Sequence, residues 1–277
     1  MVSHFRSFSH LLVFASILPP CMLVQVIALA LKLEFAKHFP LWFHRQVLRL
    51  FGFRVQRRGR QSHKAPTLYV ANHVSYLDIE VLGSMIVGSF VAKKEVRSWP
   101  VFGWLAVLQR SVFVERQPQR AADDRDEMSE RLEAGDSLIL FAEGTSGDGN
   151  RVLPFKSALF SVAQLRPKGE DLTVQPVSIT YSHLDGMPMG RFLRPYFAWY
   201  GDMELVPHIW KACGLGKVTV AVEFHPPVTL TGLGSRKALA DHCQREVQRG
   251  LTDALTGRRY RSAEALVSDH VQHLAAS

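Results

Sequence analysis

The stretch that decides the fold is Leu68-Tyr69-Val70-Ala71-Asn72-His73-Val74-Ser75-Tyr76-Leu77-Asp78. Its first four residues form an apolar run that predicts a strand. A histidine follows that strand, and an acid stands five residues after the histidine. A carboxylate in that position can hold the imidazole in a cleft and leave it able to act as a base.

The spacing of five between His73 and Asp78 requires a bend in the chain. Helix positions five apart point about 140° away from each other, because one turn takes about 3.6 residues. Ser75 can provide the bend, since Ser75-x-x-Asp78 before apolar residues resembles a capping box with an acid in place of Glu or Gln. We predict Ser75 as the N-cap, Asp78 in the first turn and His73 in the loop before it. Asp78 then fixes one imidazole nitrogen and leaves the other free to take a proton from a hydroxyl. The alternative is an ordinary loop histidine followed by a helix-start acid.

Composition narrows the class of protein. The 277 residues suit one sizeable domain with an appendage, and 47% hydrophobic residues are ample for a core. Cys21, Cys213 and Cys243 are scattered without CxxC or metal spacing, so we expect neither a disulfide framework nor a metal site. A net charge of +8 and a pI near 9.6 favour polyanionic partners: nucleic acid, anionic lipid or phosphorylated substrates.

Residues 11–31 are almost wholly apolar, and their length is near the ~20 residues that cross a bilayer. Pro19 and Pro20 fall in the middle, where they kink or break a helix, so a kinked span and a pair of half-inserted helices are both open. A cleaved signal peptide ending at Ala28-Leu29-Ala30 is a further alternative.

Basic residues follow the apolar segment, whereas Arg6 alone precedes it. By the positive-inside bias, this asymmetry puts the folded domain on the cytoplasmic side of the inner membrane, and the cations would hinder export of a cleaved precursor. They are Lys32, Lys37, Arg45, Arg49, Arg54, Arg57, Arg58, Arg60 and Lys64.

Residues 39–51 mix aromatic and aliphatic side chains with His44, Arg45 and Arg49. This mixture suits a helix in the headgroup layer, and the alternative is an amphipathic helix packed on the domain. We expect residues 1–64 to form a membrane anchor with a basic interfacial segment, and residues 65–277 to form the functional domain. Basic charge beside an anchor favours lipid over nucleic acid, and no zinc-finger, RRM or basic-zipper pattern is present.

The rest of the sequence alternates strand-like and helical patterns. Helical spacing occurs at residues 120–133, and a C-terminal helix is expected at 235–255. This alternation predicts an α/β fold, a mostly central β-sheet covered by helices. The expected strands are residues 67–71, 89–92, 111–114, 137–141, 173–180 and 218–224.

A second motif follows the strand at 137–141. Glu143-Gly144-Thr145-Ser146-Gly147-Asp148-Gly149 is a glycine-rich loop whose amides can approach an anion closely. It is not a P-loop, because the Gly-Lys-Ser/Thr ending is missing. Lys156 and Arg116 can supply charge to a phosphate.

The motifs together carry a resemblance. Asn72-His73-x4-Asp78, Phe113-Val114-x-Arg116, Phe141-x-Glu143-Gly144-Thr145 and Val174-Gln175-Pro176-Val177 follow one another as do the four blocks of the 1-acylglycerol-3-phosphate acyltransferase family. The resemblance spans roughly residues 65 to 180. It implies transfer of a fatty acyl group from acyl-CoA or acyl carrier protein, as co-substrate, to the free hydroxyl of a membrane lysolipid, with no other cofactor.

The resemblance also implies roles for single residues. His73 matches the general base that deprotonates the acceptor hydroxyl, and Asp78 matches the group that orients it. Glu143, Gly144 and Thr145 match the acceptor-binding block. In the second block, Arg116 matches the cation, and residues 65–277 become the acyltransferase domain.

Two departures from the family pattern affect the acceptor. Ser146 stands where the family commonly has Arg after Glu-Gly-Thr, and Arg110 stands where the second block usually opens with Gly. A missing guanidinium removes a bidentate phosphate ligand, which Arg110 or Lys156 can replace. The first expectation is therefore 1-acylglycerol 3-phosphate as acceptor. Lyso-ornithine lipid is a close second, because residues 198–205 resemble that bacterial subgroup.

Two hypotheses from other classes stand beside the enzyme. One is a membrane-anchored lipid-binding protein without turnover, and the other is a basic nucleic-acid-binding protein. Membrane attachment has its own energetic reason, since withdrawing a lysolipid chain into water costs about 0.8 kcal/mol per CH₂.

Overall fold

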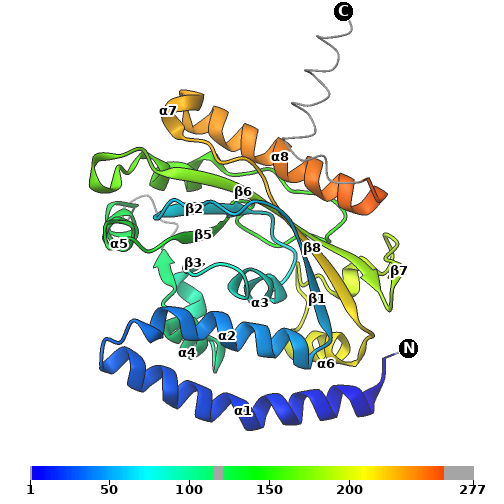
Figure 1. Cartoon of the computed structure of the whole chain (residues 1–277). Helices are drawn as coiled ribbons and strands as arrows, with labels where there is room; N and C mark the ends of the chain where they lie inside the picture. Colours follow the sequence, from blue (N-terminus) through cyan, green and yellow to red (C-terminus); the bar gives the residue numbers. More distant parts are fainter. Residues whose placement is uncertain (1, 115–120, 259–277) are drawn as a thin grey trace, which may run out of the picture.

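A computed structural model describes residues 2–114 and 121–258, with residues 121–126 described as backbone only. In this described part, eight strands form one sheet in the order β1-β8-β6-β2-β5-β3-β4, with β7 beside β6 (Figure 1). From β6 to β4 neighbouring strands are parallel, β8 runs antiparallel to β6, and β1 runs parallel to β8. The strands are β1 Phe53–Gly59, β2 Thr67–Ala71, β3 Ser89–Lys93, β4 Val112–Val114, β5 Leu138–Phe141, β6 Thr173–Leu184, β7 Met187–Pro188 and β8 Val218–Phe224.

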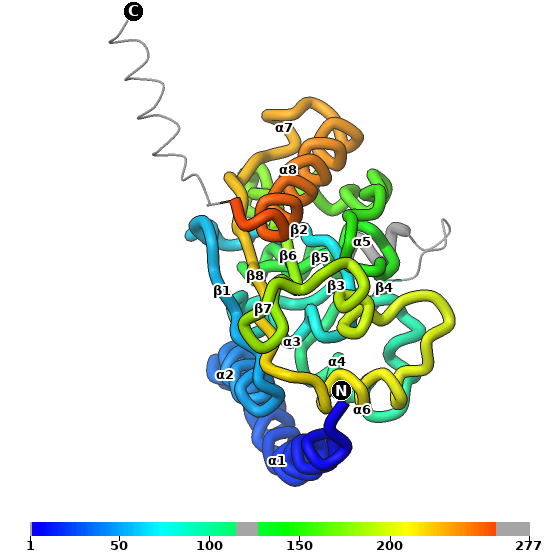
Figure 2. Tube along the Cα trace, turned by 90° about the vertical axis from the view of Figure 1, so that its right-hand side faces the viewer, coloured from blue at the N-terminus to red at the C-terminus, as the bar shows by residue number. Residues whose placement is uncertain are grey.

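Helices cover both faces of the sheet, as Figures 1 and 2 show. On one face lies α8, and on the other lies α3 with α2 below it and α1 outermost. The α-helices are α1 His4–Ala30, α2 Phe35–Leu50, α3 Leu77–Gly83, α4 Phe102–Leu108, α5 Ala121–Glu133, α6 Leu205–Gly214, α7 Leu230–Leu233 and α8 Arg236–Thr256. The 3₁₀ turns are η1 Lys94–Ser98, η3 Ser157–Gln164, η4 Pro167–Gly169 and η5 Arg194–Tyr196.

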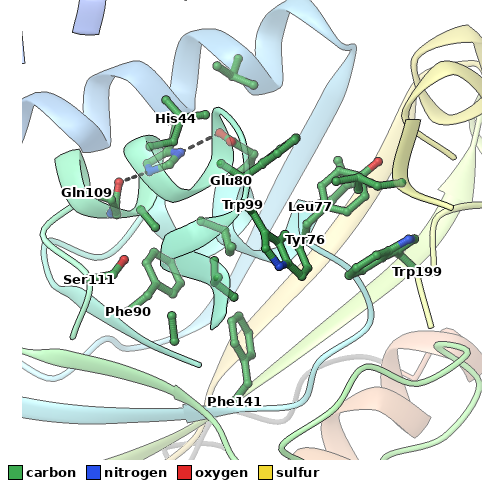
Figure 3. A pocket seen from close by; sticks show the side chains of 18 of the residues that line it. His44, Tyr76, Leu77, Glu80, Phe90, Trp99, Gln109, Ser111, Phe141 and Trp199 are labelled. Atoms are coloured by element: carbon green, nitrogen blue, oxygen red, sulfur yellow. Dashed lines mark hydrogen bonds and ion pairs between the residues drawn. The ribbon is translucent and has the colours of Figure 1, made fainter. Parts of the chain in front are cut away.

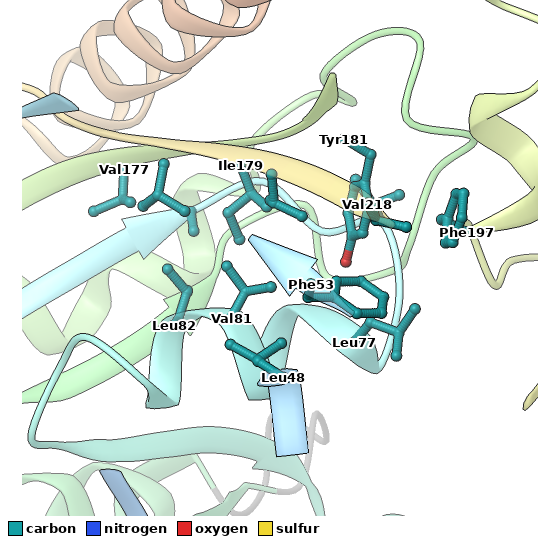
Figure 4. Close-up of a cluster of buried hydrophobic side chains, with 14 of the residues drawn as sticks. Leu48, Phe53, Leu77, Val81, Leu82, Val177, Ile179, Tyr181, Phe197 and Val218 are labelled. Atoms are coloured by element: carbon teal, nitrogen blue, oxygen red, sulfur yellow. The ribbon is translucent and has the colours of Figure 1, made fainter. Parts of the chain in front are cut away.

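The apolar run of β2 explains the two layers. Alternate strand residues point to opposite faces, so Tyr69 packs in the cluster beneath α2 and α3, whereas Leu68 and Val70 pack in the cluster beneath α8. A strand buried on both faces reads as a continuous apolar run. Figure 4 shows the first cluster, which includes Leu48 of α2 and Val81 of α3. The predicted α/β fold is confirmed.

The six predicted strands are all present, and β2 and β8 begin and end where predicted. Two strands were missed from sequence, the two-residue β7 and β1, which lies inside the segment expected to be anchor and interfacial region. Of these, β1 is the longer. It pairs with β8 along its whole length, from Phe53 opposite Val218 to Gly59 opposite Phe224. The sheet therefore takes in residues on both sides of the boundary expected at residue 64.

The N-terminal apolar segment forms one helix, α1, with Pro19 and Pro20 inside it. The alternative of two half-helices is therefore wrong. Within the described chain, α1 is the one helix long and apolar enough to cross a membrane, judged by length and composition. It also contacts the domain near both ends, because the backbone N–H of Ser3 donates to the carbonyl of Gly214 at 3.0 Å and Gln25 Nε2 donates to the carbonyl of Leu108 at 2.9 Å.

The segment expected in the headgroup layer is α2, and it packs on the domain along one face. His44, Val47 and Leu48 are buried, whereas Phe35 and Trp42 on the other side are about half exposed. The alternative of an amphipathic helix packed on the domain is therefore confirmed, and the place of its exposed aromatic side chains in the headgroup layer stays a prediction.

Candidate active site

His73 follows β2 directly, and Asp78 is the second residue of α3. The imidazole Nδ1 lies 2.9 Å from Asp78 Oδ2, so the predicted contact is present. Asp78 is fully buried, whereas the side chain of His73 is 21% exposed. No hydrogen bond from the described residues reaches Nε2 of His73, and the residue lines a large cavity.

Asp78 is held by four donors. Its Oδ2 accepts from His73 Nδ1 and from the backbone N–H groups of Val74 at 2.6 Å and Ser75 at 2.9 Å, and its Oδ1 accepts from the hydroxyl of Tyr181 at 2.8 Å. Burial, and then the neighbouring Asp78 charge, raise the pKa of Tyr181 well above its usual range, so the phenol stays protonated and donates. A carboxylate with this many donors is fixed in place.

The predicted role of Ser75 as N-cap is wrong. Helix α3 begins at Leu77 with Tyr76 as its N-cap. The Ser75 hydroxyl accepts from the N–H of Leu77 at 3.4 Å, which is long for a hydrogen bond. The bend arises instead from the carboxylate of Asp78, which reaches back to two backbone N–H groups. This is the acidic half of a capping box without its hydroxyl half.

The cavity beside His73 has a volume of about 760 Å³ and a mostly apolar lining (Figure 3). The ring of Phe141 stacks on His73 with 4.0 Å between centroids, and Phe90 stacks on Phe141 in turn. Helices α1, α2, α4 and α6 all contribute to the wall. A cavity of this size and character suits a hydrocarbon chain.

The glycine-rich loop lies against the His73 loop. Gly144, Thr145 and Ser146 line the cavity, and the N–H of Gly147 donates to the carbonyl of His73 at 2.9 Å. A third segment joins them, because the N–H of Trp199 donates to the carbonyl of Val74 at 3.0 Å and the Ser146 hydroxyl donates to the carbonyl of Trp199. These hydrogen bonds join the three segments into one rim around the imidazole.

Glu143 lies behind this rim rather than on the cavity. It is 2% exposed, and its Oε1 accepts from the N–H of Leu153 at 3.1 Å. Burial raises the pKa of Glu143 to about 8, although the backbone N–H groups of Leu153 and His73 counteract that rise. The described surroundings thus favour a protonated carboxyl that braces the loop near neutral pH.

The predicted phosphate ligands are not gathered around His73. Arg110 forms an ion pair with Asp136, and Lys156 is exposed, and neither lines the cavity. Arg116 lies outside the described residues. Of the residues that line the cavity in the described chain, Lys93 is the one Lys or Arg.

A second histidine–acid pair lies in the cavity wall, and sequence reasoning missed it. His44 Nδ1 of α2 is 2.6 Å from Glu80 Oε2 of α3, and His44 Nε2 is 2.6 Å from Gln109 Oε1 (Figure 3). Burial alone would lower the pKa of His44, but the charge and hydrogen bond of Glu80 and the contact with Gln109 outweigh it, so the pKa is raised. Its signal in the sequence was weak, because the three residues are spread over more than sixty positions.

Other residues of the site also gave little signal. Tyr181 lies beyond the predicted end of its strand, and Tyr76, Trp99 and Trp199 come from separate segments that only folding brings together. The aromatic residue Tyr76 inside the His73-to-Asp78 stretch was the one available hint.

An imidazole that a buried carboxylate orients, open to an apolar cavity on an α/β sheet, defines the class as an enzyme that acts on the hydroxyl of a lipid. Comparison with known proteins gives the family. The Acyltransferase family model matches residues 37–180, just over half of the chain, and this chain belongs to that family as an O-acyltransferase.

Individual relatives agree with this family. The chain is 48% identical to the lyso-ornithine lipid O-acyltransferase of Brucella abortus, with 84% of this chain and 89% of the relative covered. It is 40% identical to the lyso-ornithine lipid O-acyltransferase of Rhizobium meliloti, with 88% and 85% covered. The crystal structure of the 1-acyl-sn-glycerophosphate acyltransferase of Thermotoga maritima is similar with a TM-score of 0.58 and 26% identity, covering 83% of this chain and 84% of that one.

Proposed function

We propose that this enzyme transfers a fatty acyl group from acyl-CoA or acyl carrier protein to the free hydroxyl of a lyso-ornithine lipid. The single observation that carries the choice of acceptor is Ser146. Its hydroxyl donates to the backbone of Trp199, at the position where the family commonly has the guanidinium that a phosphate monoester would need.

The arrangement of His73 and Asp78 supports a direct transfer. Asp78 accepts from Nδ1–H, so Nε2 is the nitrogen that takes the proton from the acceptor hydroxyl. The oxygen attacks the thioester carbonyl, the tetrahedral intermediate expels the thiolate, and the proton on Nε2 passes to the leaving sulfur. The proton taken from the hydroxyl thus leaves with the thiol, and no acyl-enzyme is formed.

The relatives support the same acceptor. The two lyso-ornithine lipid O-acyltransferases are 48% and 40% identical to this chain, whereas the structure of the glycerophosphate acyltransferase is 26% identical. Among the described residues the cavity lining holds a single Lys or Arg, which agrees with them, since a phosphate dianion is normally held by several Arg or Lys donors. 1-Acylglycerol 3-phosphate remains the second candidate, supported by the blocks of residues that it shares with that family.

The apolar cavity is the site for a fatty chain in this proposal. Its volume of about 760 Å³ lies within the range of small-molecule pockets, and aromatic and aliphatic side chains from helices α1, α2, α3, α4 and α6 line it. His73 and Phe141 lie at the wall of this cavity, and in the proposal the reacting carbonyl lies beside His73.

For the membrane, we propose that α1 lies in the cytoplasmic leaflet of the inner membrane, with the domain on the cytoplasmic side. Hydrogen bonds tie α1 to α6 and α4, so its axis follows the domain surface. Protease should then cleave the domain in inside-out vesicles and spare it in right-side-out vesicles, and the reverse pattern would contradict this orientation. The outward face is apolar, with Phe5, Phe8, Leu12, Leu23, Ile27 and Leu31 exposed.

The deciding experiment supplies the purified enzyme with a labelled acyl thioester and two acceptors in parallel, lyso-ornithine lipid and 1-acylglycerol 3-phosphate. We expect a kcat/KM at least tenfold higher with lyso-ornithine lipid. Preference for the glycerophosphate would overturn the acceptor, and absence of transfer to either would overturn the proposed reaction. Ser146→Arg tests whether Ser146 sets the acceptor preference, because a guanidinium at this position should move the preference towards 1-acylglycerol 3-phosphate.

A further inference from the structure

Three aromatic side chains beside His73 form a concave cluster, which we call the aromatic corner: Tyr76, Trp99 and Trp199. The ring centroids of Trp99 and Trp199 are 5.9 Å apart at an interplanar angle of 86°, and those of Tyr76 and Trp199 are 6.1 Å apart at 68°. All three line the cavity, and Figure 3 shows them close to one another. In an edge-to-face pair the partner covers at most one face of a ring, so the other face can take a ligand.

The aromatic corner is built into the rim of the active site. Tyr76 stands three residues after His73 in the same loop, and the backbone N–H of Trp199 donates to Val74 at 3.0 Å. The Ser146 hydroxyl donates to the carbonyl of Trp199. The residue that replaces the family's guanidinium therefore holds an aromatic ring in place.

The polar edges of two of the rings, Tyr76 and Trp199, are already engaged. Tyr76 Oη lies 2.9 Å from His208 Nδ1, and Trp199 Nε1 donates to the carbonyl of Met203 at 2.8 Å. Burial lowers the pKa of His208 and raises the pKa of Tyr76, so both groups of this contact are neutral. The open ring faces thus carry only the negative potential of their π-systems.

We propose that the aromatic corner binds the terminal ammonium group of the acceptor's head group. This inference rests on the proposed function and names the recognition element within it. Ornithine has a carboxyl and two amines but no hydroxyl, so the hydroxyl that is acylated belongs to the chain on its α-amine. The side-chain amine stays free and cationic.

Cations are attracted to the faces of Trp and Tyr rings, whereas phosphate is repelled by the same negative faces. The same three rings of the aromatic corner therefore favour an alkylammonium head group and disfavour a glycerol phosphate head group. Lys93 and Glu95 line the same cavity two residues apart, which offers both signs of charge to a zwitterionic head.

The test compares two acceptors: lyso-ornithine lipid and the same lipid with its side-chain amine acetylated, which removes the charge. The parent enzyme should show a KM about two- to thirtyfold lower for the charged acceptor, the span of one cation–π contact. Trp99→Leu should raise the KM for the charged acceptor by a similar factor relative to the KM for the acetylated acceptor, so that the preference for the charged acceptor is lost. Trp99→Phe should restore part of the preference.

Trp99 is 37% exposed, so its replacement leaves the core intact. Trp104→Leu is the matched control, because Trp104 on the neighbouring helix α4 is 70% exposed and does not line the cavity. If Trp99→Leu and Trp104→Leu weaken turnover of both acceptors equally, the rings act as membrane anchors and the inference is overturned. Equal KM values for the two acceptors in the parent enzyme overturn it as well. Both results leave the proposed function standing, which only a lack of acyl transfer to lyso-ornithine lipid would remove.

Discussion

Two histidine–acid pairs stand on opposite sides of α3, and they differ in what the second nitrogen meets. Asp78 and Glu80 are two residues apart on the helix, and each carboxylate lies beside Nδ1 of a histidine, at 2.9 Å for His73 and 2.6 Å for His44. Nε2 of His44 faces Gln109 Oε1 at 2.6 Å, whereas Nε2 of His73 faces the cavity. A pair of this kind becomes a base only where the far nitrogen is left for a substrate.

Burial separates the pairs further. His44 is 5% exposed and joins three helices, because its partners lie on α3 and just after α4. With an oxygen at each nitrogen, its surroundings favour imidazolium and raise its pKa. At His73, a carboxylate oxygen of Asp78 contacts Nδ1, and no hydrogen bond from the described residues reaches Nε2. In the proposed mechanism, Nε2 can therefore exchange a proton during each turnover.

The largest effect should come from His73→Ala. Loss of a positioned general base typically lowers the rate by about 10²- to 10⁴-fold, while the free energy of unfolding should change little because the ring is partly exposed. Steady-state kinetics and denaturant unfolding measure the two quantities. Full activity in His73→Ala would mean that the other pair, or no pair, supplies the base.

His44→Leu should produce the opposite pattern. Removing one partner of a buried pair leaves Glu80 and Gln109 uncompensated, and we expect a loss of about 1–3 kcal/mol in the free energy of unfolding, reduced from a fully buried pair because the Glu80 side chain is 24% exposed. The decrease in kcat per folded enzyme should be far smaller than for His73→Ala. A stable but inactive His44→Leu would show that the comparison assigns the roles wrongly.

Tyr181→Phe removes one of the four donors to Asp78 and keeps the ring. Because a typical hydrogen bond contributes about 0.5–1.5 kcal/mol, we expect kcat to decrease about two- to tenfold. Tyr69→Phe is the matched control, since Tyr69 is a buried tyrosine on β2 whose hydroxyl contacts Ser62 and Gln61 instead of Asp78. Equal effects in the two variants would argue against a role for Tyr181 in holding the carboxylate.

The smallest expected effect is the pH dependence of the loss of stability caused by Glu80→Gln. The folded pKa of His44 is raised, so the pair stabilises the fold fully below the unfolded pKa of about 6.5 and loses this contribution as pH rises through the folded pKa. The difference in unfolding free energy between the parent and Glu80→Gln should therefore be about 1 kcal/mol near pH 6 and shrink at pH 9. A difference that grows with pH would reverse the sign of this assignment.

The sequence predicted the elements that bury apolar residues on regular spacing. The mostly apolar runs of β2 and β8 gave correct bounds, whereas β1 was missed because Arg54, Arg57 and Arg58 made an edge strand look like a basic linker. An edge strand with a partly exposed face accepts such residues, and single-sequence patterns do not distinguish it from a loop.

At the site, the sequence predicted the contact between His73 and Asp78 because the two residues are only five positions apart. The same reasoning failed for Ser75, since capping by a hydroxyl and by a carboxylate share the same spacing. Arg110 was considered as a phosphate ligand, but its partner Asp136 is 26 residues away and only the folded chain shows the pair. Contacts between distant segments, such as the aromatic corner, have no local signature.

Helix α1 forms the floor of the acyl cavity through Phe14, Leu18 and Met22 as well as the outermost apolar surface of the molecule. In the proposed function, the helix that touches the bilayer therefore also contacts the fatty chain. In this proposal, a change in bilayer composition would act on the same helix that lines the acyl cavity. Membrane attachment and selectivity for the fatty chain would therefore change together. Shortening this helix to obtain a detergent-free enzyme would open the cavity to water and change the catalyst itself.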